Sequence, residues 1–121
     1  MDQIDITEDL ARYIYFKKHY RSSDHTVKYS AFLPPRDRRL SVFRISGRSE
    51  TEIWSIGKNL RAQLPLGRAD IRAASVYNAG LVIDADDDPP RHANIVGWPE
   101  DDSAIKLKAM ELAEVAQLHL R

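Results

Sequence analysis

One segment of the chain repeats apolar residues at the 3.6-residue spacing of an amphipathic helix. It begins with a capping box, Ser49 followed by Glu52, and ends before Pro65, so it predicts a helix over residues 49–63. Gly57 lies inside this helix, where glycine costs about 1 kcal/mol relative to alanine. We therefore expect Gly57 to mark a place where another part of the chain packs closely against the helix backbone.

A second helical pattern predicts a helix over residues 103–120, near the C-terminus. Its apolar stripe faces one side of a helical wheel and is typical of a helix packed on a core. Leu107, Met110 and Leu118 lie off that stripe, so the second apolar side either packs within the same fold or faces a partner. The stripe consists of Ile105, Ala109, Leu112, Ala113, Ala116 and Leu120.

Two further helices are predicted, a long one near the N-terminus and a short one in the middle of the chain. Thr7 suits a helix cap, and Leu10, Ile14 and their neighbours share one helical face, which predicts a helix over residues 7–19. The aromatic and β-branched run over residues 13–16 is equally compatible with a strand. Residues 72–79 fit a short helix that ends at Gly80.

Four short segments have the β-branched and aromatic content of strands. They are residues 27–33, which end at two prolines, residues 40–46, residues 81–83 and the segment from His92 to Val96. The first two lie close enough in sequence to form a hairpin. Together these elements predict an α+β fold. We expect a small mixed or antiparallel sheet of about four strands, with two long helices and one or two shorter ones packed mainly on one face.

Length and composition agree with a single globular domain over residues 1–121. The absence of cysteine excludes disulfides, thiolate metal sites and a cysteine nucleophile. The N-terminal residues have neither the basic nor the apolar region of a signal peptide, and no apolar run approaches the length that spans a membrane. The sequence therefore predicts a cytoplasmic protein.

The formal net charge is zero, which excludes a uniformly basic protein that coats nucleic acid. Residues 1–72 contain 14 Lys and Arg against 9 Asp and Glu, whereas residues 73–121 contain 4 against 9. Either one face attracts an anionic partner, or the two halves intermix and pair within one domain. We favour the second interpretation.

The segment around His92 and Asn94 is the first candidate site. Both side chains point to the same face of the predicted strand, while the alternate residues point to the core. Histidine moves protons near neutral pH, and asparagine orients a substrate or satisfies buried backbone groups. The alternative is that both residues make structural hydrogen bonds. His19 is a candidate second proton carrier if the fold brings it near His92.

Arginines around residues 36–48 form a second candidate site. Arg44 lies in an otherwise apolar strand, where a guanidinium must reach solvent, pair with a carboxylate such as Asp70, or bind an anion. A structural ion pair is the simpler interpretation, and recognition of phosphate or carboxylate is the functional one. The candidate binding residues are Asn94, Arg44, Arg91, Trp98 and Asp70.

The acidic stretch over residues 84–88 lacks the glycine and terminal glutamate of an EF-hand loop, so we interpret it as a solvated loop. No dinucleotide, P-loop or nucleophile-elbow motif occurs, and we expect neither a cofactor nor a bound metal.

Four segments resemble a family of small bacterial proteins to which no activity is attached. They are the run from Ser41 to Arg44, the run from Glu52 to Trp54, the run from Arg68 to Asp70, and the run from Arg91 to Pro99, which is the most specific. The resemblance covers most of the chain. It implies a single bacterial domain and no particular mechanism.

Two functions follow from these observations. The first is a binding or accessory protein in a larger, possibly defence-type, multi-protein system, with Leu107, Met110 and Leu118 at the interface. It predicts a protein partner or a homo-oligomer. The second is a small enzyme or binder that acts on a phosphate-bearing substrate, a nucleotide or RNA, through His92, Asn94 and Arg44. Nucleic acid is the less favoured partner, and a membrane is not expected.

Overall fold

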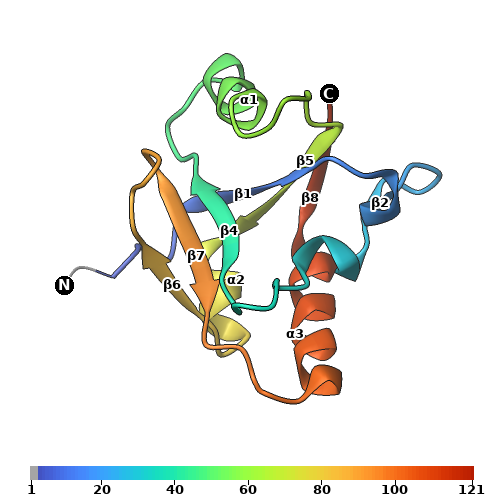
Figure 1. Cartoon of the computed structure of the whole chain (residues 1–121), viewed down its shortest axis with the longest axis vertical. Coiled ribbons are helices and arrows are strands. Elements are labelled where there is room, and N and C mark those ends of the chain that lie inside the picture. Colours follow the sequence, from blue (N-terminus) through green and yellow to red (C-terminus); the bar gives the residue numbers. More distant parts are fainter. Residues whose placement is uncertain (1–2) are drawn as a thin grey trace.

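The structure is a computed structural model that describes residues 3–121 as a main antiparallel sheet with helices on both of its faces and a small second sheet of two strands (Figure 1). The sheet strands are β1 (Asp9–Ile14), β4 (Leu40–Arg44), β5 (Gly67–Arg72), β6 (Val82–Ala85), β7 (His92–Val96) and β8 (Gln117–Leu120). The helices are α1 (Glu50–Lys58), α2 (Ala73–Asn78) and α3 (Asp102–Val115). The segment between β1 and β4 contains η1 (Lys17–His19), β2 (Tyr20–Arg21), β3 (Thr26–Val27) and η2 (Tyr29–Phe32).

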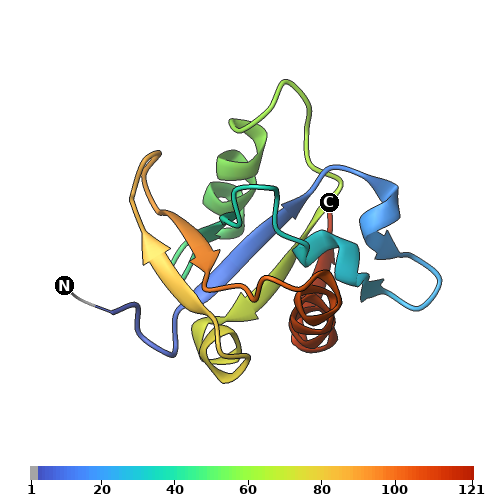
Figure 2. The ribbon, with the colours of Figure 1, turned by 60° about the horizontal axis from the view of Figure 1, so that its bottom comes forward.

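The strands follow the order β6-β7-β4-β1-β5-β8, and every neighbouring pair is antiparallel. This arrangement shows that the predicted fold is wrong. Within residues 3–121 the sheet has six strands rather than about four, and of the three helices only α1 and α3 reach seven residues. The helices also do not share one face, because α1 lies on one side of the sheet and α2 and α3 lie on the other (Figure 2).

Alternating side chains of β1 divide the core into two layers. Leu10 and Ile14 pack in the larger layer, beneath α2, α3 and η2. Ala11 and Tyr13 pack in the smaller layer, together with Ile53 of α1. A strand between two helical layers is buried on both faces and therefore loses the polar alternation that identifies a strand in a sequence.

This double burial explains why the helix predicted over residues 7–19 is wrong. The segment forms the central strand β1 instead, flanked by β4 and β5. Thr7 does not cap a helix, since its backbone N–H and its hydroxyl both donate to the carboxylate of Asp5 in a turn.

The strand predicted over residues 27–33 is replaced by short elements, and no hairpin joins it to β4. Only Val27 is in a strand, and the chain then turns through η2. Ala31 and Phe32 become fully buried in the larger core layer. Packing thus accounts for the apolar content that favoured a strand.

The helix predicted over residues 103–120 ends early. Asp101 caps α3, its side chain accepting from the backbone N–H of Ala104 at 3.0 Å, and the helix ends at Val115. The chain then forms β8, which pairs with β5 at the edge of the sheet. Polar and apolar residues alternate at the end of the helical pattern, which is typical of a strand. These residues are Gln117, Leu118, His119 and Leu120.

Several other elements lie close to their predicted positions. β4 and β7 fall within the predicted strands, and α2 occupies residues 73–78. The Ser49 side chain accepts from the Glu52 backbone N–H at 3.2 Å, as the capping box predicts, although α1 ends at Lys58 rather than near residue 63. Within residues 3–121 no helix is both long and apolar enough to cross a membrane.

Candidate active site

A serine, a histidine and an aspartate form a continuous hydrogen-bonded chain on the α1 side of the sheet. Ser41 of β4 lies diagonally across from His92 of β7, because Phe43 is the residue paired directly with His92. The Ser41 Oγ and the His92 Nε2 are 2.8 Å apart. The His92 Nδ1 lies 2.7 Å from Oδ1 of Asp86, which directly follows β6. Phe43 packs edge-on against the His92 ring, with the centroids 5.2 Å apart.

The carboxylate of Asp86 is held in place on both oxygens. The Asn94 side chain donates to Oδ2 at 3.2 Å, and the Asp88 backbone N–H donates to Oδ1 at 3.2 Å. The hydrogen bond from His92, followed by that backbone N–H, lowers the pKa of Asp86 below its ordinary value. Asp86 is therefore ionised at neutral pH.

An ionised Asp86 determines the tautomer of His92. A carboxylate only accepts, so Nδ1 of His92 donates its hydrogen to Asp86. In the neutral ring, the lone pair on Nε2 is then left to accept the hydroxyl hydrogen of Ser41. A hydroxyl aligned with an imidazole base, itself oriented by a carboxylate, is the arrangement that activates a serine nucleophile.

Ser41 also lines a pocket of about 290 Å³ beside the end of β1. Its volume lies near the lower end of the range of small-molecule sites, about 300–1,000 Å³. The lining contains aromatic rings and cationic groups and no carboxylate. The lining residues are Arg12, Tyr13, Tyr15, Phe16, His19, Ser41, Phe43, Leu60 and Arg61.

Arg12 enters this pocket where two central strands separate. β1 and β4 pair only at Leu10 with Arg44 and at Ala11 with Phe43. Beyond that point the Arg12 guanidinium bridges the strands, donating from Nη1 to the Ser41 carbonyl at 3.0 Å. Its Nε donates to the Ala31 carbonyl at 2.9 Å. Burial, and next the nearby charge of Arg61, lower the pKa of Arg12 to about 10, so it remains protonated at neutral pH.

Aromatic rings position the second arginine of the pocket. The guanidinium carbon of Arg61 lies 4.8 Å from the ring centroid of Tyr15 and 5.6 Å from that of Phe16. The His19 ring also lies near Phe16, with ring centroids 5.8 Å apart. Burial, with smaller contributions from Lys18 and Arg12, lowers the pKa of His19. The pocket therefore carries two permanent positive charges and a largely neutral histidine.

The structure brings some predicted site residues together and separates others. His19 and the Ser41 bonded to His92 line the same pocket, which links the two predicted proton carriers through the serine. Asn94 is buried and bonds to Asp86, so it positions the carboxylate rather than meeting a substrate. Arg44 is not among the lining residues of the pocket.

Arg44 forms an ion pair, the simpler of its two predicted interpretations, but with a partner other than Asp70, and Trp98 lies in the core. Arg44 pairs with Asp87 of the acidic loop, and its backbone N–H donates to the Arg91 carbonyl. Trp98 is buried, and its indole N–H donates to the Ile95 carbonyl at 2.9 Å, so it belongs to the core. The acidic loop is thus tied by ion pairs, since Asp84 also binds Arg39 at 2.8 Å.

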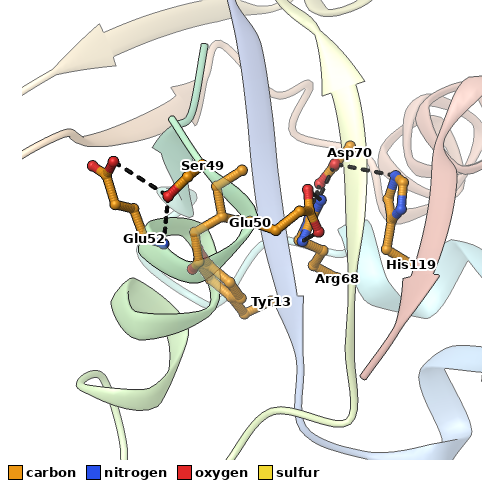
Figure 3. A network of polar contacts seen from close by, with 8 residues as sticks. Tyr13, Ser49, Glu50, Glu52, Arg68, Asp70 and His119 are labelled. Carbon is orange, nitrogen blue, oxygen red and sulfur yellow. Dashed lines mark hydrogen bonds and ion pairs between the residues drawn. The ribbon is translucent and has the colours of Figure 1, made fainter. Parts of the chain in front are cut away.

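The predicted partner of Arg44, Asp70, belongs to a separate cluster between α1, β5 and β8 (Figure 3). Arg68 is only 2% exposed and donates to both oxygens of Glu50 at 3.1 and 2.9 Å, and from Nε to Asp70 at 3.1 Å. The Trp54 ring lies 4.8 Å from its guanidinium carbon, and His119 Nε2 lies 3.3 Å from Asp70. Arg68 is fully engaged by these partners, so we assign the cluster a structural role.

The three residues predicted at the interface have different environments. Leu107 and Met110 on α3 are 62% and 46% exposed. Leu118 is buried, because it lies in β8 and points into the larger core layer. The expectation that all three lie on the surface of one helix is therefore wrong for Leu118.

The sequence predictions missed Ser41 and Asp86 as site residues, and also Arg12 and Arg61. A signal for Asp86 was present. Two neighbouring strands joined by a short acidic connection predict a hairpin, and the register in which Ala85 pairs with Ala93 places Asp86 opposite His92. Arg12 had no such signal, because the segment that contains it was assigned to a helix.

Comparisons of the chain with family models, with curated proteins and with solved structures found no match. Within residues 3–121, no group of three or more His, Asp or Glu side chains is arranged to hold a metal ion.

Proposed function

We propose that this protein is a small serine-type hydrolase that cleaves an ester, with Ser41 as nucleophile, His92 as general base and acid, and Asp86 as the residue that orients His92. The observation that carries the proposal is the unbroken hydrogen-bonded chain from Ser41 through His92 to Asp86, with Ser41 at the wall of a pocket. It refines the predicted enzymatic role of His92 by supplying the nucleophile and the carboxylate.

The reaction follows from the proton positions. Ser41 Oγ attacks the ester carbonyl carbon, and its proton moves to Nε2 of His92. As the tetrahedral intermediate collapses, the ester C–O bond breaks and His92 returns that proton to the leaving alcohol. Water then attacks the acyl-serine by the same route, which releases a carboxylic acid and restores Ser41. The negative charge of Asp86 stabilises the imidazolium that forms in each half-reaction.

The oxyanion that develops during attack requires nearby donors. Arg12 lines the same pocket and is fixed to the Ser41 carbonyl, so its guanidinium supplies a preorganised positive charge beside the reacting serine. The low exposure of His92, whose side chain is 13% exposed, limits the competition of water for its ring.

A fluorophosphonate probe tests this proposal, because it phosphonylates an activated serine with loss of fluoride. We expect labelling of the wild-type protein on the peptide that contains Ser41, detected by mass spectrometry, and hydrolysis of p-nitrophenyl acetate. Ser41→Ala and His92→Ala abolish both. Ser55→Ala, which changes an exposed serine of α1, is the matched control and retains both. Absence of labelling in the wild type, or labelling that persists in Ser41→Ala, overturns the proposal.

A second candidate function is the predicted binding role within a larger assembly. It is supported by the exposed Leu107 and Met110 of α3, and by a hollow of about 590 Å³ that Met110 lines together with β3 and η2. Native mass spectrometry of the protein purified gently from its own host tests it. A stoichiometric partner lost in Met110→Lys supports this role, and a monomer without a partner removes it.

A further inference from the structure

The pocket beside Ser41 has a charge composition that restricts what binds there. Two arginines and no carboxylate are among its lining residues. Neither arginine forms an ion pair within the part of the chain that the structure describes, although nine ion pairs occur there. In a protein with equal numbers of basic and acidic residues, two neighbouring arginines left without acidic partners are a local excess of positive charge.

Arg12 is the less expected of the two, because its side chain is partly buried. A buried charge is costly unless it is paired or hydrogen-bonded. Its bonds to the described residues come from Nε and Nη1 and reach only neutral backbone carbonyls. Its Nη2 forms no bond to those residues. The arrangement holds the guanidinium rigidly and leaves one edge able to donate into the pocket.

Arg61 supplies the second positive charge of the pocket. It lies over the rings of Tyr15 and Phe16, and these cation–π contacts use none of its N–H donors in hydrogen bonds. The mutual repulsion of Arg12 and Arg61 contributes to the lowered pKa of Arg12. An anion between the two arginines would relieve this repulsion.

We propose that the pocket binds an oxyanion, a carboxylate or a phosphate, between Arg12 and Arg61, and that the substrate is a small ester bearing such a group. Guanidinium groups match both anions in geometry. That the substrate is an ester rests on the proposed hydrolase function, whereas anion binding by the pocket does not. The volume of about 290 Å³ fits a small molecule rather than a polymer.

The first experiment titrates the wild-type protein with inorganic phosphate, and separately with acetate, at low ionic strength. Backbone amide shifts in β1 and β4 report binding by NMR. We expect saturable shifts at these strands with at least one of the two anions, and the stronger one identifies the class of anion. Arg61→Gln, which changes an exposed side chain, should weaken that binding about tenfold, as expected for the loss of one charge-assisted contact.

Two further variants make the result specific. Arg72→Gln removes an arginine whose side chain is 69% exposed and lies outside the pocket, so it should change the affinity less than about twofold. Ser41→Ala should retain anion binding, since it removes a nucleophile and not a charge. Arg12→Lys keeps the charge but loses the planar fork, and is used only if its NMR spectrum shows a folded protein.

The outcomes separate this inference from the proposed function. Anion binding that depends on Arg61, in a protein that no fluorophosphonate labels, supports the anion site and overturns the hydrolase. Hydrolysis of p-nitrophenyl acetate that phosphate and acetate do not inhibit, with no amide shifts in β1 or β4, supports the hydrolase and overturns the anion site. Equal binding in the wild type and Arg61→Gln also overturns it.

Discussion

At the scale of single residues, Asp86 is the most discriminating position in the proposed mechanism. Replacing it in Asp86→Asn preserves the size of the side chain but removes the charge that fixes His92 with its hydrogen on Nδ1. We expect kcat for p-nitrophenyl acetate to fall at least about 100-fold, with little change in KM. Asp84→Asn is the matched control, because Asp84 pairs with Arg39 at the surface and does not contact His92, and it should retain nearly full activity. Equal activity of the two variants would contradict the assigned role.

His19 gives a prediction about pH. Burial, then Lys18 and Arg12, hold its pKa below the ordinary 6.5. Because the folded-state pKa is depressed, the unfolded chain takes up this proton first, so His19 lowers stability as the pH falls through 6.5. A bound anion would favour the charged ring and raise this pKa. NMR titration of the His19 ring, with and without phosphate, checks both statements. A pKa of 6.5 or higher in the free protein contradicts the first.

The candidate site was only partly predictable from the sequence. His92 and Asn94 were identified because a strand pattern places them on one face, and both belong to the hydrogen-bonded chain. Ser41 was not distinguished from other serines, because its environment depends on the pairing of β4 with β7, which are separated by about half the chain. The carboxylate partner of Arg44 could not be identified, because Asp87 lies nearly as far away in sequence.

At the scale of elements, Gly57 determines how closely α1 approaches the sheet. A Cβ atom at this position would lie 2.6 Å from two ring carbons of Tyr13. That ring is buried, and its hydroxyl donates to the Ile53 carbonyl, so it has little room to move. We expect Gly57→Ala to destabilise the protein by about 1–3 kcal/mol, although alanine favours helices. Urea unfolding measures the change, with Ser55→Ala as an exposed control on the same helix.

The C-terminal boundary between α3 and β8 yields a second stability prediction. Leu118 of β8 is 6% exposed, whereas Leu107 of α3 is 62% exposed. Leu118→Ala should reduce the free energy of unfolding by about 2–5 kcal/mol, because it leaves a cavity in the larger core layer. Leu107→Ala should change it by less than about 0.5 kcal/mol. Similar effects of the two substitutions would contradict the assignment of residues 117–120 to a strand.

The elements that sequence patterns located best have a clear cap or a compact apolar run bounded by turn residues. Helix α1 and strands β4 and β7 show clear periodicity or clear caps, and they lie near their predicted positions. β1 is buried on both faces and β8 is a short strand that continues a helical pattern. The local pattern of apolar and polar residues determines neither the order of strands in a sheet nor their number, since both depend on long-range pairing. The number of strands was therefore underestimated.

At the scale of the whole molecule, the opposite charges of the two halves of the sequence meet in the fold. The C-terminal half contributes β6 and β7 at one edge of the sheet and β8 at the other, with β4, β1 and β5 between them. The acidic loop after β6 pairs with Arg39 and Arg44 of the first half. This is the intermixing favoured from the sequence. The positive charge left without an acidic partner in the pocket, on Arg12 and Arg61, is a local exception to it.

The same strand order predicts how the molecule opens. β1 and β7 each have a neighbour on both sides, whereas β6 and β8 each have one. Amides of β1 and β7 should therefore exchange hydrogen only through global unfolding. Amides of β6 and β8 should exchange through local opening, whose free energy is lower than that of global unfolding by at least about 2 kcal/mol. Native-state exchange followed by NMR measures both sets. Because β8 covers one edge of β5, Leu118→Ala should accelerate exchange in β8 and β5 first and leave β7 protected. Uniform acceleration across the six strands of the main sheet would instead mean that the edge strand is not an independent unit, and that the sheet unfolds as a whole.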